Sequence, residues 1–294
     1  MKFGKFELDN FLSEKRILGL SNNGGIYQLY HFSPPGDNNS FGQIGDNQFG
    51  IEWLGHSLSD HTRISATVFS SNDGNVSLAN SNAYSGYFAA SQAFDRGGLG
   101  LQRIGGYAMI GSAPTYFLNQ TTPTGEVVGT TGDPIVVTSP VPGSGAGNRS
   151  FYRAGVFGDF YIGKLDINLY YQHGSDDKFF GTSLPANGPL PPGARNPVWN
   201  GGIVEPHFTL NPQFVLFERN EWIRMSQQAI PGTPSNFGDI DAYTFGYRWY
   251  PIMTSRAGFA FHNEYSWVRQ RGTSPVSATD LTSSSLFFGF DFDF

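Results

Sequence analysis

The side chains best suited to chemistry in this sequence are its histidines and its scattered carboxylates. The histidines are His31, His56, His61, His173, His207 and His262. None of them falls in an HExxH motif or another spacing typical of a metal site. The chain has no cysteine, which excludes disulfides, thiolate metal sites, cysteine nucleophiles and covalent c-type haem attachment within it. We therefore expect a protein that is not an enzyme and that holds neither a metal nor another cofactor.

Paired carboxylates keep one enzymatic alternative open. Asp291 and Asp293 lie two residues apart, so they share one face of a strand, and two carboxylates can serve as general acid and base. Arg248 and Arg256 belong to nearby predicted strands and would lie at a similar depth. We favour a ladder of compensating charges, and a hydrolase that uses carboxylates and histidines is the least favoured alternative.

The elements that position these groups are strands, because polar and apolar side chains alternate with period two along most of the chain. Helical periodicity is almost absent. Predicted strands lie near 25–33, 47–55, 61–71, 82–94, 98–110, 149–161, 165–174, 198–208, 212–226, 238–250, 255–269 and 282–294. Segments 2–8 and 15–20 could form two more.

The connections between these strands alternate in length. Long loops are predicted at 34–46, 72–81, 111–148, 175–197, 227–237 and 270–281. Short turns are predicted at Ser57–Asp60, Asp95–Gly97, Ile162–Lys164, Thr209–Asn211 and Pro251–Thr254. Transmembrane barrels have short periplasmic turns and long external loops, whereas a soluble sandwich has no reason to alternate strictly. The sequence therefore predicts an all-β fold, a transmembrane antiparallel up-and-down β-barrel with about 12–14 visible strands.

The composition agrees with a membrane barrel. Charged residues make up only 14% of the chain, below the ~25% of soluble domains, while aromatic residues make up 16%. No apolar run reaches the ~18 residues that would predict a transmembrane helix. The net charge is −6 and basic residues do not cluster, which argues against a nucleic-acid partner.

Charge decides which face of each strand looks inward. On the lipid face near the bilayer centre a charged side chain costs about 2–4 kcal/mol. Faces with charges are therefore predicted to line the interior, and ring-bearing faces to contact lipid. Segment 212–226 carries charges at both parities, so its faces are left unassigned. The pore-lining candidates are Glu52, Arg63, Arg149, Arg153, Asp159, Asp166, Glu205, His207, Arg248, Arg256, His262, Glu264, Asp291 and Asp293.

The last strand carries phenylalanine at every second position from Phe288 to Phe294. It resembles the C-terminal strand of bacterial outer-membrane barrels, whose terminal aromatic residue is read by the barrel-assembly machinery. The resemblance implies that Phe290, Phe292 and Phe294 form that assembly signal. The segment 246–261 also resembles porin-like outer-membrane proteins of Gram-negative bacteria, in which a Pro-containing turn joins an aromatic strand end to a strand that re-enters with Arg.

The resemblance implies one barrel domain over 1–294, embedded in the bacterial outer membrane and passing small solutes or ions by passive diffusion. Residues 4–16 are similar to an internal segment of large porin-like proteins, some of them neighbours of multihaem cytochromes. A scaffold or sheath for such a haem protein is therefore the main alternative. Family members begin with a signal peptide and further strands, so we expect either a mature form or an N-terminally truncated member.

Overall fold

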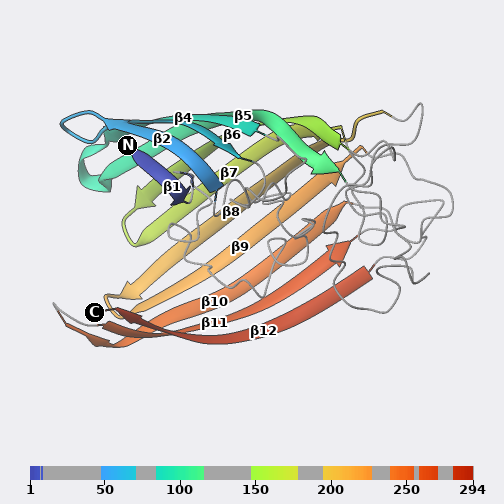
Figure 1. Cartoon of the computed structure of the whole chain (residues 1–294). Helices are drawn as coiled ribbons and strands as arrows, with labels where there is room; N and C mark the ends of the chain where they lie inside the picture. The colour runs from blue at the N-terminus through green and yellow to red at the C-terminus, as the bar shows by residue number, and fades with distance from the viewer. Residues whose placement is uncertain are drawn as a thin grey trace.

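A computed structural model describes residues 1–6, 8, 48–70, 84–115, 147–177, 195–226, 239–254, 258–270 and 281–293. Within these ranges the chain forms one twelve-stranded sheet, in which each strand pairs in antiparallel fashion with the next along the chain (Figure 1). The strands are β1 (Lys2–Phe6), β2 (Gln48–His56), β3 (Thr62–Ser70), β4 (Tyr84–Asp95), β5 (Leu101–Thr115), β6 (Gly147–Ile162), β7 (Leu165–Asp176), β8 (Val198–Asn211), β9 (Phe214–Met225), β10 (Ile240–Met253), β11 (Gly258–Gln270) and β12 (Leu281–Asp293). The predicted all-β, up-and-down architecture is confirmed.

Every strand predicted from residue 47 onward matches a strand of the structure within a few residues, and segment 2–8 contains β1. The strands predicted near 15–20 and 25–33 lie outside the described residues. Two predicted turns, Thr209–Asn211 and Pro251–Thr254, are wrong. β10 continues to Met253, because Ile252 pairs with Phe259 and Met253 pairs with Gly258. Thr209 pairs with Val215, and its amide also donates to the carbonyl of Lys164 at 2.9 Å, so it belongs to the sheet. The turn follows at 212–213, where Asn211 Oδ1 accepts the amide of Gln213.

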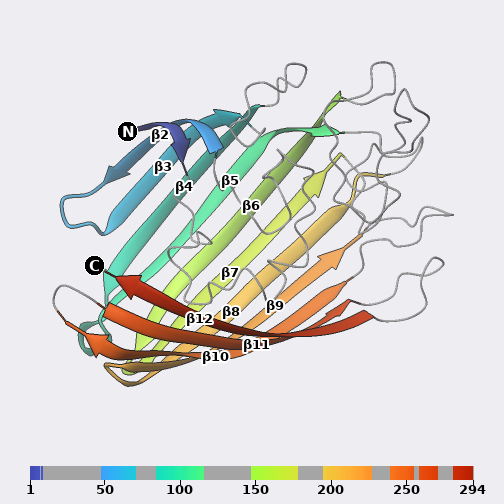
Figure 2. The ribbon, with the colours of Figure 1, turned by 60° about the horizontal axis from the view of Figure 1, so that its bottom comes forward.

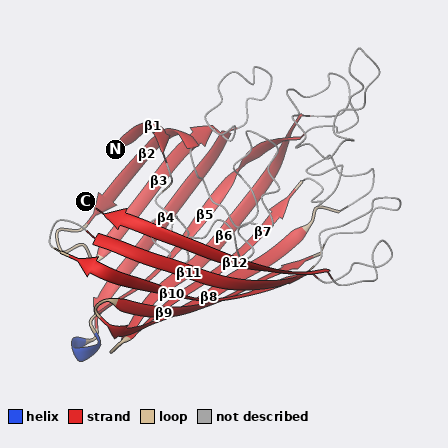
Figure 3. Ribbon diagram, turned by 90° about the horizontal axis from the view of Figure 1, so that it is seen from below, coloured by secondary structure: helices blue, strands red, loops and turns tan. Residues whose placement is uncertain are grey.

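The sheet twists and curls into a trough with a concave inner wall and a convex outer wall, as Figure 2 shows. Figure 3 shows the same wall from below, with the short 3-10 helix η1 (Gly97–Leu99) in the turn between β4 and β5. Among the described residues, no backbone pairing joins β1 to β12. Within that part of the chain, no helix is long and apolar enough to cross a membrane.

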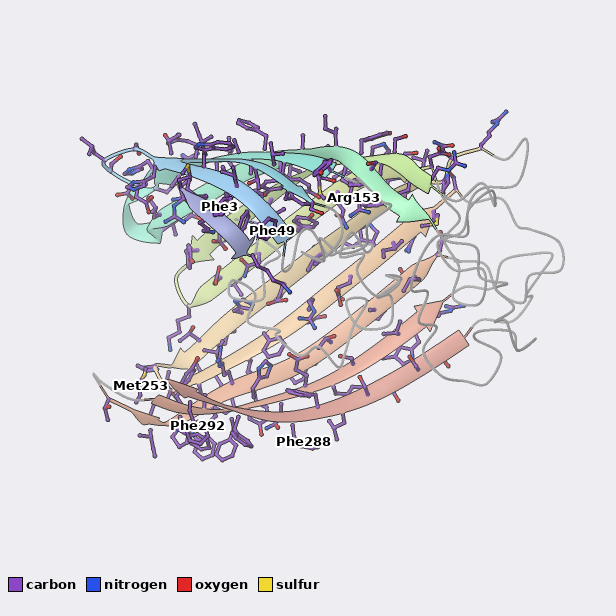
Figure 4. All side chains as sticks on the ribbon, in the orientation of Figure 1. Phe3, Phe49, Arg153, Met253, Phe288 and Phe292 are labelled. Atoms are coloured by element: carbon purple, nitrogen blue, oxygen red, sulfur yellow. The ribbon has the colours of Figure 1, made fainter. Side chains whose placement is uncertain are left out.

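The outer wall carries the apolar side chains. On β10, Phe245 is 59% exposed whereas its neighbour Thr244 is 1% exposed, which is the alternation expected when one face is solvated by a different medium from the other. The same holds on β12, where Phe288 and Phe292 project from the convex side, while Arg153 on β6 points into the trough (Figure 4). On β2, β6, β7, β10 and β11 the charged face lies on the inner wall and the ring-bearing face on the outer wall, as the rule on charged faces predicts.

Aromatic rings on the outer wall of β10 and β11 form two rows. Tyr243 stacks on Trp267 toward the loop ends of the strands, with 5.6 Å between ring centroids. Trp249 stacks on Phe261 toward the turn ends, again at 5.6 Å. The six-residue step from Tyr243 to Trp249 spans about 20 Å along the strand.

The inner wall has two halves of different chemistry. The aromatic half covers β3 to β7 and is a packed core of Leu8, Phe69, Tyr87, Tyr107, Met109, Phe151 and Tyr170. Tyr107 stacks between Tyr87 and Tyr170, at centroid distances of 5.9 and 6.0 Å. It reaches Tyr170 across β6 because Gly155 has no side chain: a Cβ there would lie 2.4 Å from Tyr107 Cε1. The charged half covers β7 to β11.

Candidate functional site: the charged half of the inner wall

The β8–β9 hairpin places the first charges of this site. Val204 pairs with Asn220 and His207 pairs with Phe217, so Glu205 and Arg219 come to lie side by side. Both side chains share the inner wall with Phe217, which is buried. Neighbouring strands add further charged side chains to the same patch. We call the resulting group the central array, and it consists of Asp166, Glu205, His207, Arg219, Glu221, His262 and Glu264.

Arg219 lies in the middle of the central array. Its guanidinium nitrogens are 3.5 Å from Glu205 Oε2, 3.3 Å from Glu221 Oε2 and 3.6 Å from Glu264 Oε2. The side chains of all four residues are at most 5% exposed. A buried charge is tolerated only when it is paired and hydrogen-bonded, and three carboxylates around one guanidinium meet that condition for the arginine.

Two glutamates of the array each join Arg219 to a histidine. Glu205 Oε1 is 2.6 Å from His207 Nε2, and Glu264 Oε1 is 2.7 Å from His262 Nε2. The Phe217 ring stands edge-on between the two imidazoles, at centroid distances of 6.4 and 5.5 Å. His207 Nδ1 is also 3.3 Å from Asp166 Oδ2. The array is therefore a continuous chain of contacts that crosses β7, β8, β9 and β11.

Carboxylates outnumber the guanidinium in this array. Its four carboxylates face one arginine and the imidazolium of His207, both of whose ring nitrogens meet carboxylates, so the patch keeps a net negative charge and attracts cations. In the described part of the chain, no group of three or more acidic or histidine side chains has a geometry that could hold a metal ion. The hydrogen-bond partners of His207 and His262 are carboxylates and the Asn168 amide.

Two predicted pore-lining residues lie on the inner wall away from the array. Glu52 on β2 is buried and meets Lys2 Nζ at 2.7 Å and Ser65 Oγ at 3.1 Å. Arg153 is fully buried in a separate ion pair, 3.2 Å from Asp176 Oδ1. Its guanidinium packs over the Phe151 ring at 4.7 Å. These contacts tie strands together and leave both charges compensated.

Other candidates lie nearer the edges of the wall. Arg63 pairs with Asp60 in the turn after β2. Arg149 Nη1 is 3.8 Å from Asp177 Oδ2 at the loop end. Asp159 pairs in register with Arg103 on β5.

Arg248 lies over the Tyr250 ring at 5.4 Å, near the turn that follows β10. Backbone pairing sets Asp291 opposite Ala260 and Asp293 opposite Gly258. The side chains of these two aspartates, together with Arg256 and Phe294, lie outside the described residues.

The structure thus brings together Asp166, Glu205, His207, His262 and Glu264, and it adds two residues that the sequence left unassigned. Arg219 and Glu221 belong to segment 212–226, whose inner face the structure now identifies. No sequence signal gives the partner of Glu205 directly. Symmetry about the 212–213 turn would set position 205 opposite position 220, and the register shift between Thr209 and Asn211 places it opposite position 219 instead.

Comparison with known proteins adds little to this geometry. No family model matches the chain, and no curated protein matches it. Among solved structures, the chain is similar to the ferric yersiniabactin uptake receptor FyuA from Yersinia pestis, with 15% sequence identity and a TM-score of 0.22. The match covers 83% of this chain and 43% of the receptor chain, so the chain spans less than half of the receptor's length. The fold assignment rests on the strand pairing itself.

Proposed function

We propose that this chain is an outer-membrane barrel protein that passes small solutes by passive diffusion, with a preference for cations, along the charged half of its inner wall. The observation that carries the proposal is the division between its two walls. Exposed rings and aliphatic side chains cover the convex wall, and charged side chains with their partners occupy the concave one.

The outer wall supports the membrane location. Soluble monomers rarely expose contiguous apolar patches larger than a few hundred Å², yet here apolar residues project outward from strand after strand of the sheet. A lipid bilayer removes the cost of that exposure. Antiparallel strands with short turns and long loops, an outward apolar band and aromatic rows near its borders are the features of outer-membrane barrels.

The central array supports the preference for cations. Rings or patches of one charge sign set ion selectivity in pores, and the array holds four carboxylates against one guanidinium and the imidazolium of His207. Its central side chains are almost fully buried. Because these side chains are in contact with one another rather than with open water, the single-channel conductance is expected to be low.

Planar-bilayer recording tests this proposal. The purified chain should give stable single-channel steps, and its reversal potential in a KCl gradient should report cation selectivity. Glu205→Gln combined with Glu264→Gln removes two carboxylates of the array, so the reversal potential should move toward zero. Glu218→Gln is the matched control, because Glu218 lies on the outer wall, hydrogen-bonded to Asn220, and should leave selectivity unchanged.

Two outcomes would contradict the proposal at different levels. A folded protein that inserts into the bilayer without conducting would reject the channel. A chain that stays folded and monodisperse in buffer without detergent would reject the membrane location altogether.

A further inference from the structure

A groove of about 560 Å³ crosses the outer wall between β5 and β9. Most of its lining side chains lie on the convex face and are apolar, among them Val156, Leu169, Tyr171, Val204 and Trp222. Trp222 lies flat against the wall, because a Cβ on Gly202 of the neighbouring strand would be only 2.1 Å from Trp222 Cζ2. The groove is in the size range of sites that bind small molecules, and its lining suits a hydrocarbon chain.

Polar side chains gather at the loop end of this groove. Tyr171, which lines the groove, donates its hydroxyl to Asn200 Oδ1 at 2.7 Å. The same oxygen is 2.9 Å from His173 Nδ1, and His173 Nε2 is 3.3 Å from the Tyr152 hydroxyl. These contacts link side chains of β6, β7 and β8 on the outer wall into one hydrogen-bonded cluster.

Arg224 extends the polar cluster to β9. It lies two residues beyond Trp222 and therefore on the same face, and it pairs across strands with Asn200. Its guanidinium forms an ion pair with Asp241 and donates to the carbonyl of Ile240 at 2.8 Å. The site therefore offers hydroxyls and an imidazole at one end and an apolar groove at the other, with the guanidinium of Arg224 beside the polar end, ion-paired with Asp241 on the β10 side.

The level of the cluster matches a headgroup region. Asp241 lies two residues from Tyr243, which belongs to the loop-side row of aromatic rings, and Asp241 pairs with Arg269. Outward charges thus begin where the apolar surface of β10 ends. Tyr and Trp side chains favour this boundary between hydrocarbon and headgroups, so the polar end of the groove faces lipid phosphates when the wall spans a bilayer.

We propose that this groove binds a phospholipid, with an acyl chain along the apolar lining and the phosphate at the cluster of Tyr152, His173 and Arg224. The inference rests on the proposed membrane location. The inference goes beyond general contact with lipid, because polar donors and an apolar groove meet at this one place on the outer wall. Guanidinium and hydroxyl donors suit a phosphate oxygen. The groove extends from these donors toward the turns.

Tryptophan quenching tests the site. Two chains are made that each keep a single tryptophan, Trp222 in the groove or Trp53 on the outer wall of β2, with the remaining tryptophans changed to phenylalanine. Each is placed in phosphatidylcholine nanodiscs, and dibrominated phosphatidylglycerol is added. The midpoint is the mole fraction of brominated phosphatidylglycerol at which half of a tryptophan's fluorescence is quenched. The midpoint of Trp222 should be about fivefold lower than that of Trp53, because one basic side chain attracts an anionic lipid by about that factor. Dibrominated diacylglycerol, which has no phosphate, should quench the two equally.

Variants locate the effect within the groove. Val156→Phe fills the groove and should raise the Trp222 midpoint to that of Trp53, whereas Val68→Phe, on the outer wall of β3, should not. Arg224→Gln should remove the preference for the phosphate-bearing lipid, whereas Arg269→Gln, a charge at a similar level outside the groove, should keep it.

The outcomes separate this inference from the proposed function. Equal midpoints for Trp222 and Trp53 with the phospholipid, or no change in Val156→Phe, would overturn the groove site alone. If brominated lipids quench neither tryptophan, the outer wall does not face lipid, and the membrane location is rejected along with the site.

Discussion

The two halves of the inner wall are both packed regions of one sheet, but their side chains are joined by different interactions. In the aromatic half, the hydroxyl oxygens of Tyr107 and Tyr170 lie 2.5 Å apart, and each lies 3.1 Å from Gln172 Oε1, which accepts a hydrogen bond from this pair within a core of apolar side chains. In the charged half, Arg219 gathers three glutamates and Phe217 separates two histidines. Both halves are buried, but the aromatic half holds one separate ion pair, Arg153 with Asp176, whereas the charged half holds a network of seven titratable side chains.

The two halves of the inner wall differ in what their buried side chains contribute to stability. An apolar, stacked core stabilises packing and tolerates a change in ionic conditions, because few of its groups titrate. A buried charged network contributes little net stability, since pairing has to offset desolvation. The position of this network on one side of the wall agrees with the cation preference proposed above. Three substitutions sharpen this contrast.

The largest effect is expected from Arg219→Met. Removing the guanidinium leaves three buried glutamates without their shared partner, so the free energy of unfolding should fall by about 3–5 kcal/mol. Urea unfolding in detergent, followed by tryptophan fluorescence, measures the change. Adding Glu205→Gln, Glu221→Gln and Glu264→Gln should restore most of the loss, because no uncompensated charge remains. An Arg219→Met protein as stable as the parent would show that the three buried glutamates do not depend on Arg219 for their stability.

A smaller effect is expected in the aromatic half from Gly155→Val. The new side chain would collide with Tyr107 Cε1 and with the carbonyl oxygen of Tyr171, 2.7 Å from the Cβ position. Overpacking of this kind costs about 1–3 kcal/mol, and the same unfolding assay measures it. Gly86→Val on the outer wall is the control, because its Cβ would meet nothing closer than 4.0 Å. Equal stability of the two variants would contradict the stacking argument.

The smallest effect is expected outside both halves, at the turn between β2 and β3. A side-chain hydrogen bond from Arg63, aided by the positive charges of Arg63 and Arg103, lowers the pKa of Asp60 below its usual 3.8. Because the folded-state pKa is depressed, this stabilisation is present above pH 4 and is lost as the pH falls through the folded value. Asp60→Asn should lower the unfolding midpoint slightly at pH 7, since the pair is exposed. The difference between variant and parent should vanish at acidic pH, and a difference that persists there would exclude this ion pair as the cause.

Sequence patterns predicted the strands and most faces, because alternation is a local property. β6 and β7 carry charges at one parity only, so their inner faces could be assigned. β9 could not be assigned because its outer wall also holds polar side chains: Glu218 hydrogen-bonds with Asn220, and Arg224 pairs with Asp241 near the end of the apolar belt.

The alternation of side chains along each strand was not enough to predict the central array. Its members come from four strands, so their meeting depends on the register of every hairpin between β7 and β11. The pattern on each strand placed Glu205 and Glu264 on inner faces, but it could not show that Arg219 lies between them. Their burial was also beyond the pattern, since an inward side chain can either line water or pack against its neighbours.

The two rows of stacked rings on β10 and β11 set a preferred membrane thickness. Barrel strands tilt by about 35–45° from the membrane normal, so a step of about 20 Å along a strand corresponds to roughly 15 Å of depth. Lipids with long tails would have to compress beside these strands, or the strands would have to stand more upright, at a modest cost for each ångström of mismatch. On the proposed membrane location, the distance between the two rows favours a thin bilayer, extended toward the turns by the exposed Ile252 and Met253, and lipids with shorter tails should be enriched beside these strands.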